Sequence, residues 1–410
     1  MLIPAVAMML LSVSACDSGI QKGTFDDVLA AIPAGASAET MPWQRVGDVC
    51  DLGGEAGDLF GRVCRLSATD PVVLVHPSDG AEVLVSAISD VAVAEDATAD
   101  WERVDVGRDG LAGRVCAAPD GTVILGGRLV WLVNSTEVSA AVHAVSAILD
   151  AGGGLPQPVR ATLKPKSGIA VVLSIDDKYI TATVSAADDR VEVRGELRDS
   201  TGAVYDFSEY AQPLNGPLSD RPACAAVAVG LRRGALARAV SKHLQPRLGV
   251  KEKLAFAAAS DILREVCGTL RATLEMEGDV AVVRVSMPYA EGGAVAATRR
   301  VSSMIRRVGQ QNTVRAEAVG DSLMRLKIAV GERPPLFSGL APMPTIAPDK
   351  DAFMALAIAP VLEGIVHLDG VEAVVYQRSF VITLHGTDLR RLSMMARGED
   401  DDADDEQSDE

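Results

Sequence analysis

The chain has 410 residues, of which 56 are acidic and 39 basic, and its formal net charge is −17. This acidic balance argues against nucleic acid as a partner. Nine of the excess negative charges lie in Glu399–Glu410, which contains no base, so the remainder of the chain carries −8. Residues 394–410 have too little apolar surface to fold, and we predict that they form a disordered acidic tail.

The N-terminal segment reads as an export signal. Residues 2–15 are apolar or small, which matches the apolar region of a signal peptide and is too short to span a bilayer. The segment ends in Val13-Ser14-Ala15-Cys16, which resembles the lipobox of bacterial lipoproteins. The resemblance implies a signal peptide over residues 1–15, lipid on Cys16 and a tether over residues 16–24. No Lys or Arg precedes the apolar run, so either translation starts elsewhere, which we favour, or the segment is not a signal.

Residues 25–150 are predicted to form an N-terminal β-rich domain that ends in a helix. Short apolar runs such as Val72–Val75 and Val83–Val85 lie between Pro, Gly, Ser and Asp residues, which is typical of strands. Thr136–Leu149 carries an apolar stripe at helical spacing. The Gly-rich stretch Ala151–Pro156 should stop this helix and mark a domain boundary.

Residues 151–393 are predicted to form a second domain, with a β-meander followed by repeated units of a helix and a hairpin. The fold class is therefore α+β, with antiparallel hairpins and meanders and with helices packed on one face. The meander strands are predicted at 159–164, 169–175, 179–185 and 191–197. Helices are predicted at 223–244, 251–266, 293–310 and 350–362. The later strands are predicted at 270–276, 280–287, 314–319, 323–330, 364–368, 371–376 and 379–384.

Five cysteines remain if Cys16 is acylated, and an oxidising envelope would favour disulfides between them. We expect Cys224 to pair with Cys267, tying two helices together. We expect Cys50 to pair with Cys64, although a bond between Cys64 and Cys116 is the alternative.

Two short segments carry a family resemblance. Asp26–Ala34 and the strand-like Asp120–Gly126 resemble segments of uncharacterised exported lipoproteins from delta-proteobacteria, and the hairpin and helix units such as Thr269–Val308 are similar too. The resemblance covers most of the mature chain loosely. It implies an exported α+β protein and no known activity.

No local motif for catalysis, metal binding or nucleotide binding occurs, so we expect no cofactor and no metal. One basic stripe is a candidate anion-binding face, although it also fits an ordinary solvated helix face. It consists of Arg299, Arg300, Arg306 and Arg307.

The leading hypothesis is a non-catalytic, lipid-anchored protein of the bacterial cell envelope with a structural, binding or assembly role. Its expected partners are the membrane, through the lipid anchor, and an envelope protein. The alternative is a carrier of an apolar or lipid ligand held between sheet and helices, and the third is a hydrolase whose active site is assembled from distant residues.

The anchoring hypothesis predicts that Cys16→Ser releases the protein from the membrane fraction, because the acylated thiol would be lost. Fractionation of the native host followed by immunoblotting checks this. Unchanged membrane association would show that another part of the chain anchors it.

Overall fold

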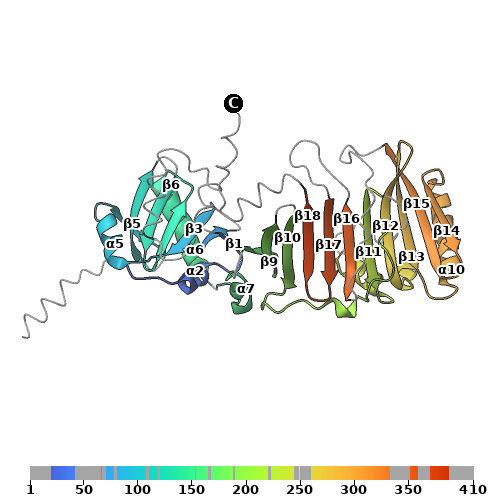
Figure 1. Ribbon diagram of the computed structural model, residues 1–410, viewed down its shortest axis with the longest axis horizontal. Helices are drawn as coiled ribbons and strands as arrows, with labels where there is room; N and C mark the ends of the chain where they lie inside the picture. Colours follow the sequence, from blue (N-terminus) through green and yellow to red (C-terminus); the bar gives the residue numbers. More distant parts are fainter. Residues whose placement is uncertain are drawn as a thin grey trace, which may run out of the picture. The chain divides into compact units, whose positions relative to one another are not determined.

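The computed structural model describes residues 20–41, 66, 71–77, 81–107, 110–118, 121–152, 154–164, 168–187, 190–219, 223–243, 249, 260–332, 351–358 and 370–386. The expected fold class is confirmed, because the chain combines helices with strands that pair antiparallel (Figure 1). The predicted signal peptide, Cys16, Cys50, Cys64 and the acidic tail lie outside the described residues.

The chain divides into two compact units. Unit 1 comprises residues 1–184 and 197–203, and unit 2 comprises residues 185–196 and 204–410. The sequence placed the boundary near residue 151, but the division lies more than thirty residues later. The reason is that Leu155, Val159, Leu163, Ala170 and Val172, all beyond the predicted boundary, belong to the core of unit 1.

Unit 1 is built on an antiparallel sheet with the strand order β9-β8-β1-β2-β3-β7-β6-β5-β4. The strands are β1 (Ser37–Met41), β2 (Val72–His76), β3 (Val83–Ala87), β4 (Glu102–Val106), β5 (Leu111–Ala118), β6 (Gly121–Gly126), β7 (Leu129–Val133), β8 (Ile169–Ile175) and β9 (Lys178–Ala187). The helices are α2 (Phe25–Ala31), α5 (Val91–Ala97), α6 (Val138–Asp150) and α7 (Gln157–Thr162).

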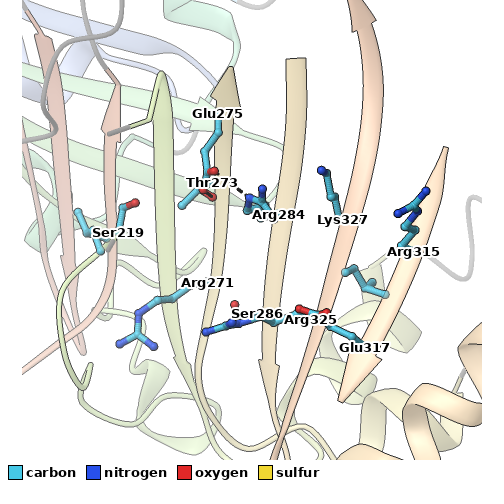
Figure 2. Close-up of a pocket in the computed structure, with 12 residues that line it drawn as sticks. Ser219, Arg271, Thr273, Glu275, Arg284, Ser286, Arg315, Glu317, Arg325 and Lys327 are labelled. Atoms are coloured by element: carbon cyan, nitrogen blue, oxygen red, sulfur yellow. Dashed lines mark hydrogen bonds and ion pairs between the residues drawn. The ribbon is translucent and has the colours of Figure 1, made fainter. Parts of the chain in front are cut away.

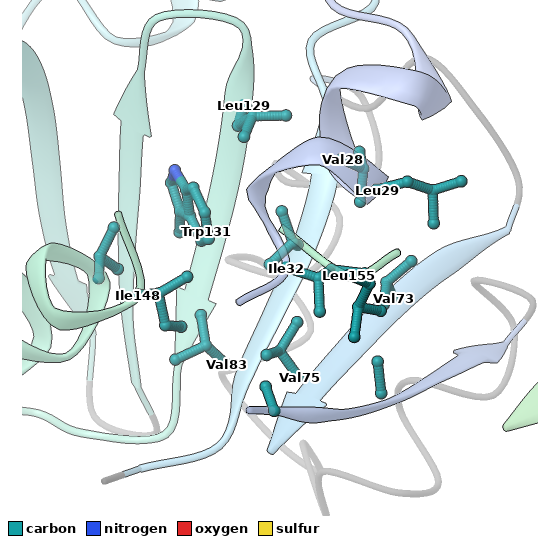
Figure 3. Close-up of a cluster of buried hydrophobic side chains, with 14 of the residues drawn as sticks. Val28, Leu29, Ile32, Val73, Val75, Val83, Leu129, Trp131, Ile148 and Leu155 are labelled. Carbon is teal, nitrogen blue, oxygen red and sulfur yellow. The ribbon is translucent and has the colours of Figure 1, made fainter. Parts of the chain in front are cut away.

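The sheet of unit 1 has an apolar core on each face. In β7, Leu129, Trp131 and Val133 enter one core, while Val130 and Leu132 enter the other. Figure 3 shows Trp131 in the first core with Ile148 of α6 and with side chains of α2. Because successive side chains of a strand point to opposite faces, a strand covered on both sides needs an unbroken apolar run.

The strands of unit 2 also pair antiparallel, in the order β10-β18-β17-β16-β11-β12-β13-β15-β14. Its strands are β10 (Arg190–Arg198), β11 (Ala225–Leu231), β12 (Gly268–Glu277), β13 (Val280–Pro288), β14 (Val314–Val319), β15 (Leu323–Glu332), β16 (Ala352–Ile358), β17 (Gly370–Tyr376) and β18 (Phe380–His385). Its helices include α8 (Ala235–His243), α10 (Gly293–Val308) and the 3₁₀ turn η2 (Phe207–Glu209).

Helix α10 covers one face of this sheet beside β14 and β15 (Figure 1). Its Ala294 and Ala297 pack in a core with Met287 of β13 and Met324 of β15. These strand residues alternate with polar ones, so the opposite face of the same strands is polar.

Two predicted elements are wrong, and the predicted helix 223–244 is right only over α8, Ala235–His243. Residues 159–164 belong mostly to the short helix α7, where Val159 and Leu163 turn into the core of unit 1. Residues 225–231 and 352–358 are strands, although their Ala-rich sequences favour helix. Tertiary pairing overrides that weak preference, because β11 and β16 pair with each other and with neighbouring strands.

The predicted disulfide between Cys224 and Cys267 is also wrong, because no bond joins these two residues. Cys224 precedes β11 and its amide donates to Leu274 near the end of β12, whereas Cys267 precedes the start of β12. The two cysteines therefore lie at opposite ends of an antiparallel strand pair, about 24 Å apart. A disulfide requires Cα atoms within about 7 Å of each other.

Helix α2 begins with a capping box that gives unit 1 a pH-dependent contribution to stability. Asp27 accepts hydrogen bonds from the backbone and hydroxyl of Thr24 and pairs with Arg128 at 3.1 Å. The hydrogen bond from the Thr24 side chain, supported by Arg128, lowers the pKa of Asp27. A lowered folded-state pKa stabilises the fold above the unfolded value of about 3.9, and this stabilisation is lost as the pH falls through the folded value.

We therefore expect Asp27→Asn to lower the free energy of unfolding of unit 1 by about 1 kcal/mol at pH 7. The difference from the wild type should begin to shrink below about pH 4, where the unfolded wild-type chain starts to bind a proton at Asp27, and should vanish once the pH falls below the lowered folded-state pKa. Denaturant titrations at pH 7 and pH 3 measure it. A difference of equal size at both pH values would contradict this account.

Candidate functional site

The polar face of the unit 2 sheet gathers five basic side chains, which we call the cationic face. Figure 2 shows them on four neighbouring strands, β12, β13, β15 and β14. They are Arg271, Arg284, Arg315, Arg325 and Lys327. The same cavity is lined by only two acids, Glu275 and Glu317, in a chain whose net charge is strongly negative.

Antiparallel register places three of these cations directly opposite one another. Arg284 of β13 pairs with Lys327 of β15, and Lys327 pairs in turn with Arg315 of β14. Directly opposite residues point to the same face and lie about 5 Å apart at their Cβ atoms. The three cations therefore form a continuous row across three strands, with Arg325 and Arg271 in the next row on the same face.

Small side chains on β11 and β16 let a chain segment form one wall of the site. Ala226 and Ala228 of β11 lie opposite Ala357 and Ala355 of β16, on the same face as the cations. Leu214 and Leu218 pack on these alanines. We call residues 211–219 the covering segment. It brings Leu218 and Ser219 to the edge of a cavity of about 440 Å³.

Backbone bonds hold the covering segment against the sheet. The amide of Gln212 donates to Gly230 of β11, and the amide of Leu214 donates to Ala352 at the start of β16. Arg271 donates to the carbonyl oxygens of Asn215 and Pro217. Arg271 therefore holds the covering segment in place, and these hydrogen bonds occupy its guanidinium.

A second cation, Arg284, is held by one buried carboxylate and one exposed carboxylate. Glu275 is only 7% exposed, accepts from Arg284 at 2.8 Å and also accepts from the hydroxyl of Thr273 at 2.8 Å. Glu277 accepts from Arg284 and from Lys327. This network fixes the Arg284 guanidinium and the Lys327 ammonium beside the cavity.

Arg315 and Arg325 differ from the other cations. Both are exposed, and within the described part of the chain no carboxylate lies within ion-pair distance of either guanidinium. Glu317 lies opposite Arg325 in register, but that pair makes no ion pair in the structure. A guanidinium can bind an oxyanion through two parallel N–H bonds, so these two arginines have donors to offer a ligand.

The basic stripe predicted from the sequence is a different surface. Arg299, Arg300, Arg306 and Arg307 are exposed on α10, which packs on the apolar face of the sheet, opposite the cationic face. Arg306 donates to the backbone oxygen of Ser302, one turn earlier. Nothing in the structure tests whether this stripe binds an anion, and that prediction stands as made.

The described residues contain no cluster of three or more His, Cys, Asp or Glu side chains that could hold a metal ion. Among those residues, no helix is both long enough and apolar enough to cross a bilayer.

Comparison with protein-family models, with curated proteins and with solved structures finds no match to this chain.

The covering segment lies so close to β11 that position 230 has no room for a side chain. A Cβ atom on Gly230 would overlap the carbonyl oxygen of Gln212. We expect Gly230→Ala to displace the segment and to lower the free energy of unfolding of unit 2 by about 1–3 kcal/mol. Hydrogen exchange resolved by unit measures it. Gly35→Ala is the control, because a Cβ there meets no atom within 4 Å. Equal stability of Gly230→Ala and the wild type would show that the segment does not lie on β11.

Proposed function

We propose that unit 2 binds a ligand carrying phosphate or carboxylate groups, and that the chain is a non-catalytic binding protein. The observation that carries this proposal is the row of three cations, Arg284, Lys327 and Arg315, in direct cross-strand register on the wall of a cavity.

The row is energetically unfavourable for the sheet alone. Like charges directly opposite one another destabilise a strand pair, by an amount within about 0.2–1 kcal/mol. Glu277 offsets this repulsion for Arg284 and Lys327. Arg315 receives no such compensation among the described residues. Electrostatic repulsion that the fold does not need, and that nothing in the sheet relieves, is typical of a functional site.

The dimensions and lining of the cavity suit a polar ligand. A volume of about 440 Å³ lies within the range of small-molecule sites, about 300–1,000 Å³. Ten of the twelve lining residues are polar or charged, which favours an oxyanion over the apolar ligand that we considered as an alternative. The buried carboxylate of Glu275 is engaged by Arg284 and Thr273, so it is better placed to orient Arg284 than to accept a substrate proton as a hydrolase would require.

Anchoring to the cell envelope remains part of the proposal on sequence grounds alone. Its support is the apolar leader ending in Val13-Ser14-Ala15-Cys16. The two parts are independent, since an oxyanion site on unit 2 requires no particular location of the chain.

Tripolyphosphate is a suitable probe, because several closely spaced charges can bridge the row of cations. We expect the double variant Arg315→Gln/Arg325→Gln to bind it at least about tenfold more weakly than the wild type, a loss of about 1.4 kcal/mol. Isothermal titration calorimetry at low ionic strength measures the affinity, and citrate in place of tripolyphosphate distinguishes a carboxylate ligand from a phosphate ligand.

Arg299→Gln/Arg300→Gln is the matched control, because it removes the same charge from exposed arginines on the opposite face of the same sheet. Its affinity should stay close to that of the wild type. Equal losses in both double variants would mean that only the overall charge of unit 2 matters, and the proposed site would be wrong.

A further inference from the structure

The strongest negative charge of the chain and its cationic face belong to the same unit. Residues 399–410 contain nine carboxylates and no base. Unit 2 contains both this segment and the cationic face. We propose that residues 399–410, which we call the acidic tail, dock on the cationic face and compete with the oxyanionic ligand. This inference rests on the proposed function of that face.

The sheet register brings the C-terminal end of β18 to the correct end of the cavity. Leu384 of β18 shares a cross-strand row with Leu274 of β12, through Val371, Ile358 and Ala225 on the strands between them. Leu274 is next to Glu275, which lines the cavity. The chain therefore leaves β18 at the end of the sheet where the carboxylate network of the site lies.

The chain beyond β18 is long enough to reach the site. Fourteen residues lead from His385 to Glu399, and such a stretch spans at most about 46–50 Å when extended. In the sheet order, β13 lies five strands from β18 and β14 lies seven strands away. At a spacing of about 4.8 Å these separations are about 24 Å and about 34 Å. The connecting length therefore reaches every strand of the cationic face.

The chemistry of the two partners is complementary. Arg315 and Arg325 are exposed, and within the described residues they have no carboxylate partner. A tethered carboxylate-rich segment is present at an effective concentration in the millimolar range, so even a weak contact would be populated. Because the contact is exposed, added salt should screen it.

The arginines of α10 offer similar charge but a different surface. They lie on the outer side of one helix, whereas the cations of the site converge from four strands beside a cavity. Convergent donors can contact several carboxylates of one segment at once, which favours the cationic face as the docking site.

The test compares the full chain with a variant that ends at Gly398, by calorimetric titration with tripolyphosphate at low ionic strength. We expect the truncated chain to bind at least about fivefold more tightly, because the competing tail is absent. A synthetic peptide of residues 399–410 should restore the weaker binding when added to the truncated chain. The increase on truncation should persist in the Arg299→Gln/Arg300→Gln background.

Crosslinking gives a readout independent of affinity. Carbodiimide treatment joins a carboxylate to a nearby amine, and Lys327 supplies an amine inside the cavity. We expect mass spectrometry to find peptides in which residues 399–410 are joined to Lys327, and to lose them in Arg315→Gln/Arg325→Gln and at high salt.

The outcomes separate the two proposals. Equal affinity of the full and truncated chains for tripolyphosphate, without the Lys327 crosslink, would overturn tail docking and leave the binding site intact. Failure of the truncated chain to bind tripolyphosphate would overturn the proposed function and this inference with it. A truncation effect that disappears in Arg299→Gln/Arg300→Gln would place the tail on α10 and would also contradict the inference.

Discussion

Antiparallel register is the constraint on which the candidate site depends. It fixes which side chains of neighbouring strands face each other, and in unit 2 it places Arg315, Lys327 and Arg284 in one row. No single strand carries this concentration of charge. The electrostatic character of the face arises only when two hairpins, β12–β13 and β14–β15, pair through β13 and β15.

The polar face of this sheet is charged over some strands and covered by a chain segment over others, because the side chains differ in size from strand to strand. Arg and Lys occupy the polar face of β13, β15 and β14, whereas Ala226, Ala228, Ala355 and Ala357 occupy it on β11 and β16. Small residues allow the backbone of another segment to approach closely. The covering segment therefore lies on the alanines, and its edge encloses the cations from one side. One continuous face thus provides a packed part and an open, charged part.

Much of this sheet could be predicted from the sequence, because polar turns mark where strands end. The bounds predicted for residues 169–175 and 314–319 match β8 and β14. The turn at Gly278 and Asp279 even sets the register of β12 with β13, so that Thr273 lies opposite Arg284. The pairing of β13 with β15 joins segments on either side of α10, and no turn encodes it. For this reason the sequence indicated the arginines of α10 and missed the cationic face.

The available signal for that face was an alternation of basic residues within strands, such as Arg325 and Lys327 two positions apart. Alternation alone is also typical of any solvated strand face, so it could not identify a site without the register. The Ala-rich strands were missed for a related reason. The sequence AAVAVGL of β11 favours helix by composition, and only its pairing with β12 and β16 makes it a strand.

The fold of unit 2 holds Arg284, Lys327 and Arg315 in one row against the electrostatic repulsion between them. The most direct measurement uses the chain that ends at Gly398, in which the acidic tail cannot compensate Arg315. It compares the free energy of unfolding of unit 2 in Arg315→Gln with that of the otherwise unchanged truncated chain, by native-state hydrogen exchange at β15 without ligand, at low and high salt. We expect the variant to be more stable than the truncated chain by up to about 1 kcal/mol at low salt, and the difference to shrink as salt screens the charges. A variant that is less stable at low salt would contradict this, because Arg315 would then be stabilising the sheet.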